Sequence, residues 1–149
     1  MTIEELTKSR TITLEKKTLL NVMMTQNVLS EQLNVILKPF EISAEQFNVL
    51  RILRGQSGQP ASMAVIQERM VAKTSNTTRL VDKLLAKELV TREVCSDNRR
   101  KIDVTITDLG LALLVDLDPK IDTYESAFAA KLTQDELVTL NQLLEKYRI

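Results

Sequence analysis

The fold of this chain is decided by the segment Ser62–Lys101, which reads SMAVIQERMVAKTSNTTRLVDKLLAKELVTREVCSDNRRK. Its apolar spacing predicts a helix over about 63–70, and Ser62 is a suitable N-cap because its hydroxyl can accept from a free backbone N–H of the first turn. A turn at 71–72 and a second helix over about 74–87 follow. Two helices joined by so short a turn predict a helix-turn-helix.

A β-hairpin is expected directly after the second helix. The segments 89–95 and 102–107 predict two strands, because the second alternates Ile, Val and Ile with Asp and Thr, as a half-buried edge strand does. Between them, 96–98 supplies turn residues. A helix-turn-helix followed by such a hairpin predicts a winged helix-turn-helix lobe over residues 43–107, an architecture that recognises double-stranded DNA.

The second helix of the predicted lobe has a polar outer face. At about 100° per residue, Thr77 falls on the buried arc, whereas Arg79 points the opposite way. Short polar side chains let a backbone approach a major groove, and an arginine can bind a guanine edge through two hydrogen bonds. Alternatively, the hydroxyl residues only cap the helix. We expect DNA contacts from Thr74, Ser75, Asn76, Thr78, Arg79 and Lys83.

The chain has no net charge, yet its charges are unevenly distributed. Residues 1–68 carry seven basic and seven acidic side chains, residues 69–101 carry nine and four, and residues 102–149 carry four and nine. The positive field is therefore confined to the helix-turn-helix and its hairpin, as binding to DNA phosphates requires. A solvated basic face would have the same balance, so charge alone leaves both interpretations open.

The predicted tip of the hairpin is also basic. A basic tip beside such a helix can reach an adjacent minor groove, whose negative potential attracts arginine. Taken without the helices, the same tip could be a solubilising charged loop. Together with the helices, it predicts DNA contacts from Arg99, Arg100 and Lys101.

Composition excludes several function classes. A length of 149 residues with three Gly and three Pro favours one mainly helical domain. The absence of His and the single Cys leave almost nothing for a metal site or a nucleophile–base pair, so neither an enzyme nor a cofactor is expected. We expect no membrane span and no signal peptide, and the single Cys is typical of a cytoplasmic protein.

Helices are expected on both sides of the lobe. Residues 1–12 predict a loose arm, 13–38 a long helix that Pro39 ends, and 108–149 two helices. Pro119 should kink or restart the first of these two rather than end its apolar pattern. Helix caps are expected at Ser43, Thr107 and Thr133. Apolar residues along these helices step by three and four, more than one small core needs. Unless they all pack within one chain, 13–38 and 108–149 form a dimerisation region through Leu19, Val22, Leu29, Leu117, Ile121, Tyr124, Phe128, Leu140 and Leu144.

Several spaced motifs resemble the MarR family of bacterial transcription regulators. They are Ile42–Leu50, Arg79–Leu84, Leu89–Glu93, Asp97–Arg100 and Thr107–Gly110. The motifs cover about residues 40–115. The order of the expected helices resembles that of the family along the whole chain, which implies a single domain of residues 1–149. Two residues depart from the family pattern. Glu88 stands where the family usually has a glycine at a left-handed helix end, and Lys73 stands where many relatives have an acidic or small residue.

The resemblance implies a homodimer that places each recognition helix in a major groove and each wing in a minor groove of a pseudo-palindromic site. It implies a repressor that a small-molecule effector releases by changing the spacing of the two lobes. Met23 and Met24 could line the effector pocket, or simply pack in the core. By position, base and phosphate contacts match Ser75, Asn76, Thr78 and Arg79, the wing-tip arginine matches Arg99, and the acidic residue that steadies it matches Asp97.

Two other functions fit parts of the sequence. A winged helix can bind protein instead of DNA, but such a module would present an exposed apolar patch in place of Arg79 and Arg99. Cys95, which ends a predicted wing strand, would make the chain an oxidant sensor if nearby arginines favoured its thiolate.

Overall fold

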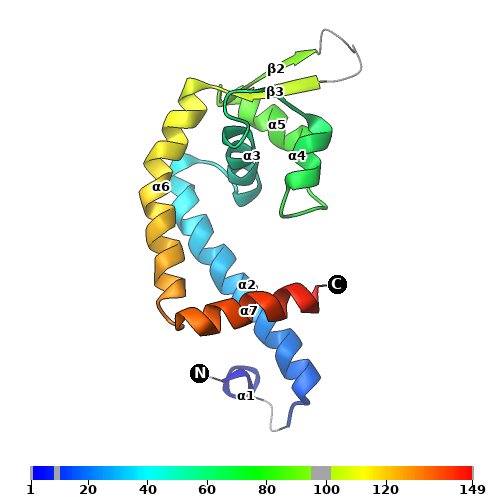
Figure 1. Cartoon of the computed structure of the whole chain (residues 1–149), viewed down its shortest axis with the longest axis vertical. Coiled ribbons are helices and arrows are strands. Elements are labelled where there is room, and N and C mark those ends of the chain that lie inside the picture. Colours follow the sequence, from blue (N-terminus) through cyan, green and yellow to red (C-terminus); the bar gives the residue numbers. More distant parts are fainter. Residues whose placement is uncertain (1, 9–10, 95–101, 149) are drawn as a thin grey trace.

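The computed structural model describes residues 2–8, 11–94 and 102–148. It is mainly helical, with a small antiparallel sheet at one end (Figure 1), which confirms the predicted fold class. The elements in chain order are α1 (Ile3–Thr7), α2 (Leu14–Leu37), the 3-10 helix η1 (Lys38–Phe40), α3 (Ala44–Arg54), β1 (Ala61–Ser62), α4 (Met63–Arg69), α5 (Thr77–Ala86), β2 (Val90–Val94), β3 (Ile102–Ile106), α6 (Asp108–Ala129) and α7 (Gln134–Tyr147).

The winged helix-turn-helix consists of α3, α4, α5 and the three strands. The sheet has the order β1-β3-β2, and both pairings are antiparallel. The two-residue strand β1 was not expected, because two residues show no alternation; its pairing of Ala61 with Val104 creates it. The core that joins helices and sheet includes the fully buried Leu50, Leu53, Ile66, Val81, Leu84 and Val104.

The second helix of the motif starts later than the sequence predicted. α5 begins at Thr77, not at 74, because Asn76 is the N-cap and its side chain accepts from the backbone N–H of Arg79 at 3.1 Å. The turn before α5 therefore spans residues 70–76. Thr77 is only 6% exposed, in agreement with its predicted place on the buried arc.

The first residues form a helix, so the prediction of a loose arm is wrong for their described part. Thr2 and Glu5 form a capping box at the start of α1. On the same helix, the carboxylate of Glu4 binds Nζ of Lys17 on α2 at 2.8 Å, and this hydrogen bond lowers the pKa of Glu4. Ile3 is buried. These contacts anchor α1 on α2.

The long helices α2 and α6 pack against each other and connect the lobe to the opposite end of the molecule, where α7 crosses α2 (Figure 1). The hydroxyl of Tyr124 on α6 donates to the carbonyl of Leu29 on α2 at 3.1 Å, and burial raises the pKa of Tyr124. α6 continues through Pro119 as one helix, so Pro119 neither ends nor restarts it. Within the described residues, no helix has the length and hydropathy of a membrane span. The expected caps form at Ser43, Thr107 and Thr133.

The apolar residues predicted for dimerisation differ in exposure. Leu117 and Ile121 are 0% and 6% exposed and belong to the core of the single chain, so no second chain is needed to cover them. By contrast, none of the residues of α7 is buried. The chain therefore leaves apolar surface open on α2 and α7, where Leu19, Leu140 and Leu144 are exposed. The other residues predicted for dimerisation are half-buried: Val22, Leu29, Tyr124 and Phe128.

α5 ends in a left-handed turn at Glu88, whose φ is 58°. The N–H of Glu88 donates to the carbonyl of Leu85 at 2.9 Å, and the N–H of Leu89 donates to the carbonyl of Leu84 at 3.1 Å. These are the two hydrogen bonds of a Schellman motif, which favours glycine at the left-handed position. Any residue with a Cβ is strained there, so a glutamate at this place weakens the fold.

Replacing Glu88 with glycine is therefore expected to raise the free energy of unfolding by about 1 kcal/mol. Thermal unfolding of E88G should show a midpoint about 3 °C above that of the wild type. E88A is the matched control, because it removes the carboxylate but keeps the Cβ, and it should gain nothing. If both variants gained equally, the carboxylate and not the backbone conformation would be the source of strain.

Candidate nucleic-acid interface

The exposed side of α5 and its N-cap together carry four of the six residues that the sequence predicts for DNA contacts from this helix. Thr78, Arg79 and Lys83 are exposed along the helix, and Asn76 is exposed at its N-cap. Thr74 and Ser75 lie in the preceding turn and not on the helix. The N–H groups at the start of a helix attract anions, so this end of α5 suits phosphate oxygens as well as base edges.

Arg79 and Lys83 have no carboxylate partner in the part of the chain that the structure describes. The carboxylate of Asp82 on α5 binds Arg92 of β2, with Nη1 and Oδ1 2.6 Å apart. This pair neutralises the acidic side chain on α5 and ties the first wing strand to the helix. Both residues lie in motifs that the sequence singled out, but sequence reasoning missed their pairing because no local rule joins a helix to a later strand.

β2 and β3 form the stem of the wing, at the same end of the molecule as α5 (Figure 1). Their register runs from Val90 opposite Ile106 to Val94 opposite Ile102. The described part of the stem ends at the pair Val94 and Ile102. The wing contacts predicted from the sequence, and the cysteine considered for oxidant sensing, lie outside the described residues and stay predictions: Asp97, Arg99, Arg100, Lys101 and Cys95.

A cavity of about 350 Å³ lies between α2 and the lobe. A volume of this size accommodates a small organic molecule. Met23 and Met24, considered for such a pocket from the sequence, are not part of its lining. The cavity is lined from α2 by Gln26, Ser30 and Leu33, from α3 by Ala44, Glu45, Phe47, Asn48 and Arg51, and from the turn by Met70, Val71 and Ala72.

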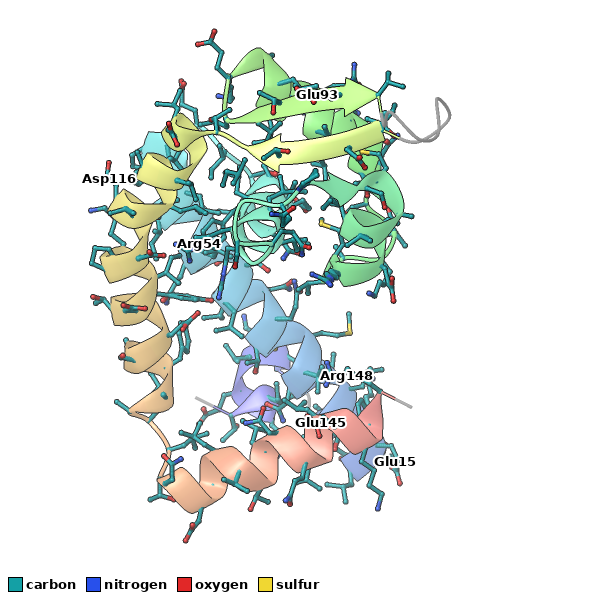
Figure 2. All side chains as sticks on the ribbon, turned by 45° about the horizontal axis from the view of Figure 1, so that its top comes forward. Glu15, Arg54, Glu93, Asp116, Glu145 and Arg148 are labelled. Atoms are coloured by element: carbon teal, nitrogen blue, oxygen red, sulfur yellow. The ribbon has the colours of Figure 1, made fainter. Side chains whose placement is uncertain are left out.

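Two arginines on α3 link the lobe to α6. Arg54 lies between α3 and α6 (Figure 2), and its Nη1 donates to both carboxylate oxygens of Asp118, at 3.0 and 2.8 Å. Arg51 also lines the cavity, and its Nη1 lies 3.9 Å from Oε1 of Glu125 on α6. Exposed ion pairs stabilise a fold only slightly. Their position means that they orient the lobe relative to the long helix.

Comparison with known proteins identifies relatives over most of the chain. The model of the MarR family matches residues 42–102. The uncharacterized HTH-type transcriptional regulator YpoP of Bacillus subtilis (strain 168) is 30% identical over 132 residues, which are 89% of this chain and 90% of that protein. The chain thus matches this relative over almost its full length.

Two solved structures extend the comparison. The MarR transcription factor from Planctomyces limnophilus has a TM-score of 0.71 and 32% identity, covering 91% of this chain and 98% of that one. A mutant MarR from E. coli, solved in complex with operator DNA, has a TM-score of 0.75 and 26% identity, covering 85% of this chain and 89% of that one.

Proposed function

The chain belongs to the MarR family of DNA-binding transcription regulators, and we propose that it acts in the cytoplasm as a homodimer on a pseudo-palindromic DNA site. Each α5 enters a major groove, and each wing reaches the adjacent minor groove. The homodimer represses transcription until a small-molecule effector weakens its hold on DNA. The observation that carries the proposal is the exposed basic side of α5, where Arg79 and Lys83 have no ion-pair partner among the described residues.

Several features of α5 support its place in a major groove. Arg79 and Lys83 are one helical turn apart on the exposed side, and Asn76 and Thr78 are short enough to let the backbone approach. An arginine in this position can form two hydrogen bonds with a guanine. The acidic balance of residues 102–149 would repel phosphates from the other end of the chain.

The homodimer is supported by the open apolar surface of α2 and α7. A groove of about 580 Å³ lies between these helices, and its lining is Thr18, Asn21, Val22, Leu140, Leu143, Leu144, Lys146 and Tyr147. The leucines of the groove are 37–58% exposed, so covering each of them would contribute about 1 kcal/mol towards an interface with a second chain. The proposed surface comprises Leu19, Val22, Leu29, Tyr124, Phe128, Leu140 and Leu144, without the already buried Leu117 and Ile121.

The effector is proposed to bind in the cavity between α2, α3 and the turn. A ligand shifts an equilibrium only through different affinities for the two states. A ligand in this cavity would contact Arg51, which also faces Glu125 on α6. Binding could therefore favour a different orientation of the lobe relative to α6, and with it a different separation of the two α5 helices.

Replacing Arg79 with alanine tests the proposed function. The reference duplex is one that the wild type selects from a random-sequence library. R79A should bind this duplex about 10- to 100-fold more weakly, because an arginine–guanine contact provides 1–3 kcal/mol. In a salt series its affinity should also fall less steeply, if Arg79 displaces a counterion. Fluorescence anisotropy measures both quantities.

R148A is the matched control, since Arg148 is the C-cap of α7, which lies at the opposite end of the molecule from the sheet (Figure 2). It should bind the duplex as the wild type does. A wild type that enriched no sequence and bound no pooled genomic fragments at low salt would contradict DNA recognition, and a winged-helix module for protein binding would replace it.

A further inference from the structure

We propose that two amide side chains, Gln67 and Asn48, are positioning residues that hold α5 in register for recognising a DNA sequence without touching DNA themselves. The inference rests on the proposed DNA recognition by α5. Its physical basis is the turn of residues 70–76, which joins α4 to α5 and contains no helix or strand. Val81 and Leu84 pack α5 onto the core of the lobe, and the turn decides where the first residues of α5, including Asn76, begin.

Gln67, on the last turn of α4, spans the turn with both ends of its amide. Its Oε1 accepts from the hydroxyl of Thr77, in the first turn of α5, and its Nε2 donates to the carbonyl of Lys73 at 2.8 Å. Thr77 is 6% exposed and Gln67 is half-buried, so this hydrogen bond is partly shielded from water. One neutral side chain thus connects α4, the middle of the turn and the start of α5.

Asn48 fixes the beginning of the turn from the opposite helix. It lies on α3, and its Oδ1 accepts from the backbone N–H of Val71 at 2.8 Å. The side chain of Val71 is 86% exposed, so side-chain burial contributes little to holding this residue. Within the turn, the N–H of Ser75 donates to the carbonyl of Ala72 at 3.1 Å. This local bond shapes the turn, whereas Asn48 and Gln67 attach it to the neighbouring helices.

The residue type matters at both positions. An amide offers a donor and an acceptor without a charge, and Gln67 uses both. A glutamate there could accept from Thr77 but could not donate to Lys73. At position 48 only an acceptor is used, so an aspartate could still bind the N–H of Val71. This difference gives each position a conservative variant with a different expected outcome.

Loss of these hydrogen bonds should affect specific binding more than non-specific binding. Base contacts require side chains held within about 0.5 Å of their place. Phosphate contacts come from flexible cations and tolerate small shifts, and they supply most of non-specific affinity. A displaced α5 would therefore keep its attraction to DNA and lose part of its preference for one sequence.

The experiment compares two affinities for each variant by fluorescence anisotropy. One duplex is selected by the wild-type protein from a random-sequence library, and the other is a scrambled duplex of the same length and composition. Q67L, N48L and T77V should bind the selected duplex about ten-fold more weakly, and the scrambled duplex within about two-fold of the wild type. Q67E should also lose specificity, whereas N48D should stay within about three-fold of the wild type on the selected duplex.

Q142L is the matched control, because Gln142 is an exposed amide in the middle of α7, and it should leave both affinities unchanged. T77V keeps the volume of the buried side chain, so it tests the hydrogen bond even if the leucine variants unfold. If the wild type selects no sequence, the proposed DNA recognition fails. If it selects one, and T77V and the folded leucine variants keep the ratio of the two affinities within two-fold of the wild type, the positioning role is overturned while DNA recognition stands.

Discussion

Replacing Gly110 with alanine is expected to lower the free energy of unfolding by about 3 kcal/mol. Gly110 lies in the first turn of α6, where the helix passes against the end of α5. A Cβ built on it would lie 2.3 Å from the carbonyl oxygen of Leu89 and 2.8 Å from Cγ1 of Ile106. The first of these atoms belongs to the backbone, so a rotamer change cannot relieve the overlap.

The same place holds several hydrogen bonds that a shift of α6 would weaken. The backbone N–H of Thr107 donates to the carbonyl of Leu89 at 3.1 Å, and its hydroxyl donates to the carbonyl of Glu88 at 2.8 Å. The hydroxyl of Thr107 also accepts from the N–H of Gly110 at 3.1 Å, as the N-cap of α6. Gly110 therefore lets α6, the wing stem and the end of α5 meet closely.

Thermal unfolding measures this effect at equal protein concentrations. The midpoint of G110A should fall by about 10 °C, given the usual entropy of unfolding of a domain of this size. G55A is the matched control, because a Cβ on Gly55 would lie 3.3 Å from the nearest backbone oxygen and its φ is −64°. It should stay within about 1 kcal/mol of the wild type. A midpoint of G110A within the error of the wild-type value would contradict the close approach.

Introducing two glutamates at Leu140 and Leu144 is expected to separate the proposed homodimer. These residues are 41% and 37% exposed in the single chain, so a glutamate at either position can keep its carboxylate in water in the isolated protomer. In the dimer it would bury two carboxylates without partners on each protomer, each at a cost of several kcal/mol. Light scattering after gel filtration should give the dimer mass for the wild type and half that mass for L140E/L144E.

The same variant should also lose affinity for the selected duplex. Two linked binding lobes gain about 100-fold or more over a single lobe, and a monomer forfeits this gain. T139E/Q142E is the matched control, because it adds the same charges to α7 away from the face that carries Leu140 and Leu144. It should remain dimeric and bind as the wild type does. A wild type with the mass of one chain would refute the homodimer, whatever the variants do.

The sequence by itself determined the order and the caps of most helices. Ser43, Ser62, Thr107 and Thr133 all act as N-caps where their spacing from the following residues predicted. Thr77 is buried and Arg79 exposed, as helical periodicity required. These features depend on residues three or four positions apart, whose relation is the same in any helix, so local rules suffice for them.

Only the tertiary structure decided which residue caps α5 and which apolar helix faces are buried. Thr74, Ser75 and Asn76 could each cap α5, and the choice of Asn76 goes with the burial of Thr77 against Gln67 from another helix. The apolar residues of α6 and α7 step by three and four alike. Leu117 and Ile121 of α6 nevertheless face the core of their own chain, whereas no residue of α7 is buried.

The pairing of Asp82 with Arg92 and the close approach of Gly110 to Leu89 likewise join different elements of the fold, which no helical or strand periodicity relates. The physical reason is common to all of these cases. Helical periodicity states which side chains share a face, but what covers that face depends on where the rest of the chain packs.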